Sequence, residues 1–287
     1  MELNGWADLH SHSTASDGTE APKDNVRMAQ EAGLTAVAIT DHDTVAGVRE
    51  ALAEGRERGI EVVPGVEIST VMGGIDIHVL GYFIDTENDL LLERLDSLRK
   101  ARYRRNLKII ENLNRLGINI RLEDVTERAA KNGKDETVGR PHIADVLVDR
   151  GIVDSMQEAF EVYLDRKGKA YAQVERIRPE TAVQWIREAG GAAVLAHPGI
   201  YHNDEIVQEI IVSGIDGIEA YHSDHSVQDE ERYLRLAHEH KLIVTAGSDF
   251  HGTRQGNVFH GALGSKRIDM KAVHALKGLS QQMKEQT

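Results

Sequence analysis

The sequence contains no cysteine. This absence excludes disulfides, thiolate nucleophiles and sulfur-bound zinc, so any metal must be held by imidazole and carboxylate groups. The chain also lacks an apolar run of 18 or more residues, and its start shows neither the basic flank nor the cleavage site of a signal peptide. We therefore expect a cytoplasmic protein that does not associate with membranes.

Basic residues are fewer than acidic ones, with 34 Lys and Arg against 47 Asp and Glu and a net charge of -13. This balance argues against a broad basic surface that coats nucleic acid. A local site can still be positive on an acidic protein if several carboxylates bind cations. We therefore expect a small ligand, and anionic substrates stay open.

Short β-branched or apolar runs alternate with helical segments over most of the chain. Such alternation predicts a parallel sheet or barrel. The predicted strands cover residues 6–9, 36–40, 61–66, 75–83, 192–196, 217–221 and 242–246. The predicted helices between them cover residues 21–32, 45–58, 179–189, 203–213 and 229–240.

The middle of the chain, residues 87–173, has helical patterns and no convincing strand. One helix is expected over 90–116 and another over 155–164. Between them, Pro141 suits the first turn of a helix that Gly151 would end. We predict a barrel built from residues 1–86 and 174–287, with 87–173 inserted as a helical cap.

Residues that bind metals follow nearly every predicted strand. In a parallel barrel these strand ends meet on one face, where such folds assemble their active sites. Only 14 residues are histidine, yet six of them occupy these positions, which favours a site for several metal ions over chance. In "DLHSHS" the spacing of two also places both imidazoles on the same side of a strand, where they can bind one cation.

Seven motifs, in order from residue 8 to 252, carry a family resemblance: "DLHSHSTASDGT", "ITDHDTV", "PGVEIST", "IHVLGY", "GRPHIA", "AHPG" and "GSDFHG". The sequence resembles the PHP (polymerase and histidinol phosphatase) family, in its branch of stand-alone metal-dependent phosphoesterases. The resemblance implies an α/β fold, a distorted (β/α)7 barrel with an inserted helical subdomain, and three divalent cations at the carboxyl face of the barrel. Manganese is the ion expected from the family, with iron or zinc as alternatives.

The resemblance also implies which side chains hold each ion. It assigns the first ion to His10, His12, Glu67 and Asp249, the second to Glu67, His78 and His197, and the third to Asp17, His42 and His251. Glu67 would therefore bridge two ions. All nine residues are present, so an inactivated family member is not expected.

Clustered cations suit phosphate ester hydrolysis because they offset the charge of the phosphate oxygens and generate a strong nucleophile. A hydroxide bridging two metals would attack phosphorus in line, while the third metal holds a nonbridging oxygen. No protein nucleophile is then needed, consistent with the absence of cysteine and of a Gly-x-Ser-x-Gly elbow. We predict Asp249, His197 and Arg140 as catalytic, with Asp249 serving as a ligand and a possible proton relay.

For substrate binding we predict Arg140, His222 and Tyr221. Arg140 precedes a helix start, which favours an anion, and the resemblance implies a phosphate contact for it; a solvent-facing role is the alternative. Ordinary loop polarity explains His222 and Tyr221 about as well as substrate contact does. His142 is left open between the site and the helix surface.

Several other polar residues keep two interpretations. Asp41 and Asp43 either orient imidazoles or cap the following helix. The basic segment 94–108 is either a solvated helix face or the positive face of a cap that attracts polyanions such as short oligonucleotides. Its members are Arg94, Arg99, Lys100, Arg102, Arg104, Arg105 and Lys108, and five further histidines are expected at the surface, namely His202, His238, His240, His260 and His274.

The predicted function is hydrolysis of a small phosphorylated nucleotide or ribose phosphate, such as AMP or a nucleoside 3',5'-bisphosphate. Ile200 stands where many relatives of the latter type carry arginine, which weakens that choice. The alternatives are a cyclic ribose phosphate diesterase, a 5'-3' exoribonuclease acting on short RNA, a histidinol phosphate phosphatase, an amidohydrolase, or a non-catalytic nucleic-acid-binding module that metals stabilise. No stable protein partner is expected.

Overall fold

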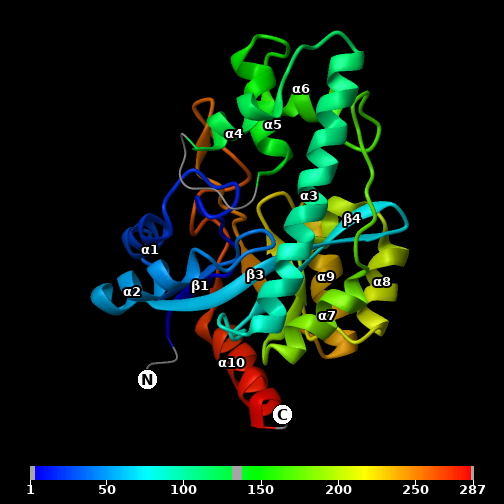
Figure 1. The fold of residues 1–287 in the computed structure, drawn as a ribbon. Helices are drawn as coiled ribbons and strands as arrows, with labels where there is room; N and C mark the ends of the chain where they lie inside the picture. Colours follow the sequence, from blue (N-terminus) through cyan, green and yellow to red (C-terminus); the bar gives the residue numbers. More distant parts are fainter. Residues whose placement is uncertain (1–3, 131–137, 286–287) are drawn as a thin grey trace.

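A computed structural model describes residues 4–130 and 138–285. Eight strands form one curved sheet in the order β10-β1-β2-β3-β4-β5-β6-β7. The sheet nearly closes, because the backbone N–H of Leu9, just after β1, donates to the carbonyl of Ala246 in β7 at 2.9 Å. The predicted α/β barrel is therefore confirmed (Figure 1). Its strands are β1 (Trp6–Asp8), β2 (Ala36–Ile39), β3 (Glu61–Met72), β4 (Ile75–Tyr82), β5 (Ala192–Leu195), β6 (Gly217–His222), β7 (Ile243–Gly247) and β10 (Ile268–Asp269).

All seven predicted strands are present, but one runs against the expected direction. β3 continues past residue 66 to Met72, and Gly73 and Gly74, with φ of 57° and 75°, turn the chain straight into β4. β4 then pairs antiparallel with both β3 and β5. The expectation of a wholly parallel barrel is wrong here, because a two-residue turn is too short for a crossover.

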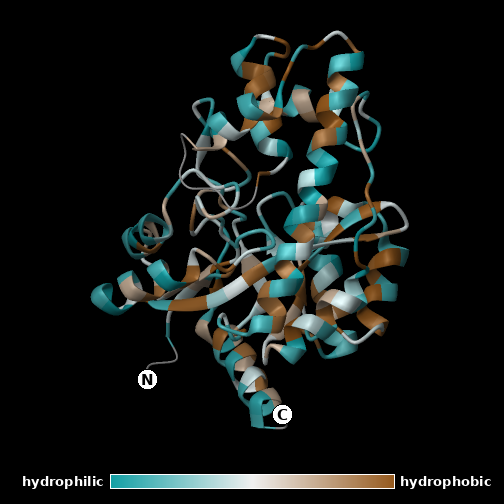
Figure 2. Cartoon of the chain, viewed as in Figure 1, coloured by the Kyte–Doolittle hydropathy of each residue, from teal (hydrophilic) through white to brown (hydrophobic). Residues whose placement is uncertain are grey.

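Amphipathic helices surround the sheet (Figure 2). Their apolar sides and the strands form buried clusters, one of which joins Val66 and Ile68 of β3 to Ile210 of α8. The helices of this layer are α1 (Pro22–Glu31), α2 (Val48–Arg58), α7 (Pro179–Glu188), α8 (Asp204–Val212), α9 (Val227–His240) and α10 (Met270–Glu285). Shorter elements are the 3-10 helix η2 (Pro198–Tyr201) and the hairpin of β8 (Thr253–Arg254) and β9 (Asn257–Val258).

Within the part that the structure describes, the predicted insertion contains helices joined by turns and irregular segments, and no strand. Its helices are α3 (Asp89–Arg115), α4 (Leu122–Ala130), α5 (Arg140–Asp149), α6 (Met156–Ala159) and the π-helix η1 (Phe160–Leu164). α4 was not predicted, nor were β10 and α10 near the end of the chain. Residues 1–3, 131–137 and 286–287 of the predicted domain ranges lie outside the described residues, and the division into a barrel and a cap stays a prediction.

α3 connects two separate hydrophobic clusters. Its first turns place Leu91 and Leu95 in the barrel cluster, and its last turns place Ile109 and Leu113 in a second cluster with α4, α5 and α6. Figure 1 shows the helix running from beside the sheet to the group of α4, α5 and α6. One continuous helix therefore connects the two clusters.

In the described ranges, every helix is too short or too polar to cross a lipid bilayer.

Leu113→Ala should destabilise the protein by about 2–5 kcal/mol, because the side chain is fully buried and its removal leaves a cavity. Chemical denaturation followed by circular dichroism measures this change. Leu107→Ala on the same helix is the matched control, since Leu107 is 42% exposed and should change stability by less than about 1 kcal/mol. Equal losses for both variants would contradict the second cluster.

Candidate metal centre

The structure brings all nine predicted ligand side chains to one end of the barrel. Seven follow strands: six of them are His10, His12 and Asp17 after β1, His42 after β2, and Asp249 and His251 after β7. His197 follows β5, whereas Glu67 lies within β3. His78 lies in the first half of β4, and it reaches the same end because this strand runs in the opposite direction. Their role as ligands stays a prediction.

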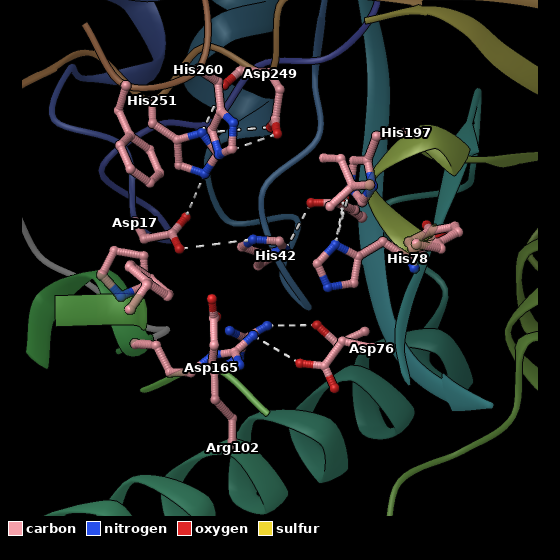
Figure 3. A pocket seen from close by; sticks show the side chains of 18 of the residues that line it. Asp17, His42, Asp76, His78, Arg102, Asp165, His197, Asp249, His251 and His260 are labelled. Carbon is pink, nitrogen blue, oxygen red and sulfur yellow. Dashed lines mark hydrogen bonds and ion pairs between the residues drawn. The ribbon is translucent and has the colours of Figure 1, made fainter. Parts of the chain in front are cut away.

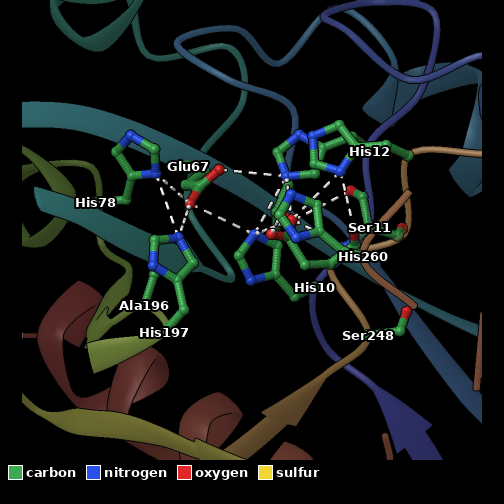
Figure 4. A network of polar contacts seen from close by, with 12 residues as sticks. His10, Ser11, His12, Glu67, His78, Ala196, His197, Ser248 and His260 are labelled. Atoms are coloured by element: carbon green, nitrogen blue, oxygen red, sulfur yellow. Dashed lines mark hydrogen bonds and ion pairs between the residues drawn. The ribbon is translucent and has the colours of Figure 1, made fainter. Parts of the chain in front are cut away.

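Glu67 lies at the centre of this cluster. Figure 4 shows its carboxylate between His78 and His197 on one side and His10 and His12 on the other. Its Oε1 is 2.9 Å from His78 Nδ1 and 3.0 Å from His197 Nε2. Its Oε2 is 2.8 Å from His42 Nδ1 and 3.2 Å from His12 Nε2. One buried carboxylate is thus shared among several imidazoles.

Two further carboxylates extend the cluster on the side away from His78. Asp249 Oδ1 lies 3.2 Å from His10 Nε2 and 3.1 Å from His12 Nε2. Asp17 Oδ1 lies 3.3 Å from His251 Nε2. Asp249 adopts a φ of 53°, a strained backbone conformation that the surrounding structure must maintain and that is common at functional sites.

The donor set fits divalent cations better than it fits hydrogen bonds. His42 Nδ1, Glu67 Oε2 and Asp249 Oδ1 are buried and close to other donors of the cluster, yet in the described part of the chain none of them makes a hydrogen bond of acceptable geometry. The Nε2 atoms of His10 and His12 lie 3.2 Å apart. Two atoms that each lie about 2.1 Å from one ion are about 3.0–3.4 Å apart at octahedral and tetrahedral angles. The distance between these two Nε2 atoms and their distances to Asp249 Oδ1, 3.2 and 3.1 Å, fall in this range, and the donors are nitrogen and oxygen only.

The carboxylates of the cluster are ionised despite their burial. Burial alone would raise the pKa of Glu67, but the imidazoles of His42 and His78 outweigh it and hold the pKa well below its usual value. Asp249 and Asp17 are affected in the same direction by their own imidazole neighbours. All three groups are therefore anionic, which is the form that binds a cation.

Glu219 is a site residue that the sequence analysis missed. It lies in β6, is fully buried, and holds His10 Nδ1 at 3.1 and 3.2 Å through its two oxygens. It also accepts a hydrogen bond from the backbone N–H of His197 at 2.9 Å. A carboxylate behind an imidazole fixes its orientation and leaves Nε2 free for a metal. The available signal was a glutamate inside the apolar strand "GIEAYH".

Asp41 and Asp43 follow neither of their two interpretations. Asp41 accepts hydrogen bonds from Ser13 N and Oγ and from Ser16 Oγ, each at 2.7 Å, and so shapes the loop that carries His12. Asp43 accepts from the backbone N–H of Ser69 at 2.8 Å and pairs with Arg102 at 2.7 Å. Among the described residues, neither side chain caps α2 or makes a hydrogen bond to an imidazole nitrogen.

A cavity of about 320 Å³ lies between the cluster of potential metal ligands and a wall of arginine side chains. Figure 3 shows Asp76, Arg102 and Asp165 across this cavity from Asp249 and His251. Arg140, the first residue of α5, lines the same wall, and its Nη2 donates to Asp76 Oδ2 at 2.8 Å. Arg140 therefore faces the cavity and not bulk solvent, and its contact with a substrate phosphate stays a prediction.

The basic segment 94–108 is split by the geometry of α3. Arg102 and Arg105 are buried and line the cavity, whereas Arg104 and Lys108 are exposed. Neither a wholly solvated face nor a wholly binding face describes this helix. The sequence could not separate the buried arginines from the exposed basic residues, because it does not show which face of the helix other elements pack against.

The other predicted substrate residues lie away from the cavity. Tyr221 is partly buried, packs against the barrel cluster and is not among the residues that line the cavity, so its contact with a substrate stays a prediction. His222 is fully buried, its Nε2 lies 3.3 Å from Asp249 Oδ2, and it forms a group of potential metal donors with His10 and Asp249. It is not among the residues that line the cavity, and its contact with a substrate stays a prediction. His142 is also buried, and its Nδ1 accepts from Gly139 N at 3.0 Å at the start of α5.

His260 is exposed, as predicted, and its imidazole also lines the cavity. Its Nε2 lies 3.6 Å from Asp249 Oδ2, and its Nδ1 lies 2.5 Å from Asp224 Oδ2. With Asp249 and His251 it forms one further group of potential metal donors. It follows β9 in a loop without an apolar run, so the strand-end argument could not identify it.

Comparisons with known proteins agree with this geometry. A PHP domain model matches residues 8–189. The 3',5'-nucleoside bisphosphate phosphatase of Chromobacterium violaceum is 35% identical over 254 residues, covering 87% of this chain and 88% of that protein. The 5'-3' exoribonuclease Rnm of Escherichia coli is 37% identical over 251 residues, covering 85% and 84%. A solved structure from Bifidobacterium adolescentis, assigned to the metal-dependent phosphoesterases, has a TM-score of 0.84 and 34% identity, covering 95% of this chain and 96% of that one.

Gly247→Ala should lower the metal content of the purified protein. A Cβ at this position would overlap His10 Cβ and would lie 2.5 Å from Glu219 Oε1, so His10 must move. Elemental analysis measures the loss. Gly278→Ala in α10 is the control, because a Cβ there meets no atom within 4 Å and should leave the metal content unchanged. Full metal retention by Gly247→Ala would contradict the placement of His10.

Glu219→Gln should weaken metal binding by about 10- to 100-fold, because His10 loses the anionic partner that orients it. Competition with a chelator of known affinity measures the change. Glu231→Gln, at an exposed position of α9, should bind metal like the unaltered protein. An unchanged affinity in Glu219→Gln would remove this residue from the site.

Proposed function

This chain belongs to the PHP domain family, and from that premise we propose that it is a metal-dependent phosphoesterase. Its substrate is a small phosphorylated nucleotide or ribose phosphate. The observation that carries the proposal is the pairing of two walls across one cavity, a cluster of imidazole and carboxylate donors and a group of arginines. Bound cations and guanidinium groups both neutralise phosphate oxygens.

The nine residues of the cluster would hold three divalent ions in the sets expected from the sequence. We propose Mn²⁺, with Fe²⁺ or Zn²⁺ as alternatives, because imidazole and carboxylate ligands accept each of them. When bound, such ions activate water for attack on phosphorus and offset charge on the phosphate oxygens. Within the cluster, Glu67 is placed to serve two ions, because its oxygens face different imidazoles.

The protein's own side chains orient the ester and move protons. Arg140 at the start of α5 offers a guanidinium and a helix N-terminus to a phosphate. Asp249 can take up a proton and pass it on, since its Oδ2 lies 3.3 Å from His222 Nε2 and 3.6 Å from His260 Nε2. His197 is also proposed as a catalytic residue, because its Nε2 contacts Glu67 at the centre of the cluster.

A nucleotide fits the cavity better than a bare sugar phosphate. Phe160, Phe259 and Tyr201 line it together with the charged groups, and aromatic rings offer stacking surfaces for a base. Hydrolysis of AMP or of a nucleoside 3',5'-bisphosphate is therefore our first choice. Exonucleolytic cleavage of short RNA is the second, because it needs the same base and phosphate contacts. Cytoplasmic location and the lack of a stable protein partner stay predictions.

The test measures phosphate release from a panel of mononucleotides, nucleoside bisphosphates, cyclic phosphates and short 5'-phosphorylated RNA. Chelation should abolish turnover and Mn²⁺ should restore it. Glu67→Gln should lower kcat on the order of 10³-fold, because it removes the charge shared by two ion sites. His238→Asn, at an exposed position of α9, should turn over normally.

Retained folding and metal with no turnover of any phosphate ester would contradict the proposal. Elemental analysis of the active protein decides the number and identity of the ions. Thermal unfolding with and without chelator separates loss of catalysis from loss of the fold.

A further inference from the structure

We propose that the hydroxyl of Tyr201 is a positioning group for the second metal ion, because it sets the distance between His78 and His197. This inference rests on the proposed function, in which these two imidazoles and Glu67 hold that ion. It adds a residue that need not touch the ion and that acts through the backbone beside two of its ligands.

The hydroxyl completes the last residue pair of the ladder between β4 and β5. These strands are antiparallel, with Val79 opposite Leu195, so His78 stands opposite Ala196. In such a pair the two residues normally exchange both N–H···O bonds. Here Ala196 N donates to the His78 carbonyl at 3.2 Å, but His78 N donates to Tyr201 Oη at 3.1 Å. That hydroxyl in turn donates to the Ala196 carbonyl at 2.7 Å, so a tyrosine oxygen is inserted into the pair.

The inserted hydroxyl lies beside two predicted ligands. His78 is a member of this pair, and His197 follows Ala196 in the chain. His78 Nδ1 and His197 Nε2 are 3.3 Å apart, close to the spacing of about 3.0–3.4 Å for two atoms on one ion at about 2.1 Å. Figure 4 shows both imidazoles on the same side of Glu67. The separation of β4 and β5 at this pair therefore decides whether both imidazoles reach one ion.

The backbone at His197 brings Tyr201 to this place. His197 adopts φ of 26° and ψ of 56°, which ends the strand and begins the 3-10 turn η2, and the side chain of Tyr201 at the end of η2 reaches back to Ala196. Tyr201 is only 6% exposed, and its ring lies 5.6 Å from that of His197 between centroids. Burial raises the pKa of Tyr201 well above its usual value, so the hydroxyl keeps its proton and donates it. The Ala196 carbonyl is the nearer acceptor, since that of His78 lies at 3.5 Å.

Other contacts of this segment come from the side of β6. Glu219 accepts from the N–H of His197 at 2.9 Å, and His225 Nε2 accepts from the N–H of Gly199 at 3.0 Å. Removing the Tyr201 hydroxyl leaves these two contacts in place. A buried N–H and carbonyl without partners are costly, so the strands should close at this pair and move His78 relative to His197.

The experiment compares Tyr201→Phe with the unaltered metal-loaded protein, because this change removes the hydroxyl and keeps the ring. Titration with a chelator of known affinity should show one Mn²⁺ held about 10- to 100-fold more weakly, and the other ions changed less than about 3-fold. Elemental analysis after dialysis against a low concentration of Mn²⁺ should show the loss of one ion. Excess Mn²⁺ should restore kcat to within about 3-fold of the unaltered value, with KM unchanged.

Tyr233→Phe is the matched control, because Tyr233 is also buried but is not among the described residues that line the cavity. It should retain every ion. His78→Asn removes a ligand of the second ion directly, and its combination with Tyr201→Phe should bind metal like His78→Asn alone, since both changes act on the same ion. Unchanged affinity in Tyr201→Phe, equal weakening of all ions, or additive losses in the double variant would overturn the proposal.

Hydrogen exchange of the unaltered protein gives a second test, which holds even if Tyr201→Phe fails to fold. In the Zn²⁺-loaded protein, which suits NMR, the amide proton of His78 should be protected from exchange, because the Tyr201 hydroxyl holds it. Rapid exchange of this proton would overturn the proposal.

Metal binding separates this proposal from the proposed function, because it needs no turnover. If Tyr201→Phe loses one ion but no form of the protein hydrolyses a phosphate ester, the positioning role stands and the phosphoesterase assignment fails. If hydrolysis is observed but Tyr201→Phe holds all ions like the unaltered protein, the reverse is true.

Discussion

The burial of one carboxylate, that of Glu67, is the constraint on which the candidate site depends. Taking an ionised carboxylate out of water costs several kcal/mol unless positive or polar groups surround it. Here imidazoles from β4 and from the loops that follow β1, β2 and β5 converge on it. The barrel brings these distant segments together, and the charge of Glu67 keeps their rings facing one point.

Much of the fold could be predicted because buried strands leave continuous apolar runs. The direction of β4 was missed, although Gly73 and Gly74 were visible between two such runs; the alternating pattern alone does not report strand direction. α10 was missed because Gly278 and several polar residues interrupt its apolar face, which becomes evident only when Val273 and Leu276 pack beneath the barrel.

The candidate site, like the fold, could be predicted only in part. The histidines and carboxylates that follow strands were recognisable as potential metal ligands, because strand ends meet on one face of a barrel. Glu219 and His260 were not, because one lies inside a strand and the other in a loop far from any apolar run. Substrate contacts were the least predictable: Tyr221 and His222 follow each other in β6, so the pleat sends them to opposite faces, and neither reaches the cavity.

α3 explains how an acidic protein maintains a basic wall. Leu98 anchors the helix in the barrel cluster and Ile109 anchors it in the second cluster, and Arg102 and Arg105 occupy the turns between them. The arginines therefore lie where two apolar clusters meet, held from both sides. Asp43 connects this wall to the metal side, because it binds Arg102 and directly follows His42.

The reversed strand β4 holds two residues of the cavity at a fixed spacing. Asp76 and His78 are two residues apart in β4 and both line the cavity, Asp76 holding Arg140 and His78 contacting Glu67. Their backbone separation is about 7 Å, because a strand rises about 3.4 Å per residue. Strand geometry thus fixes the distance between the backbone points from which the arginine wall and the metal-donor cluster are held.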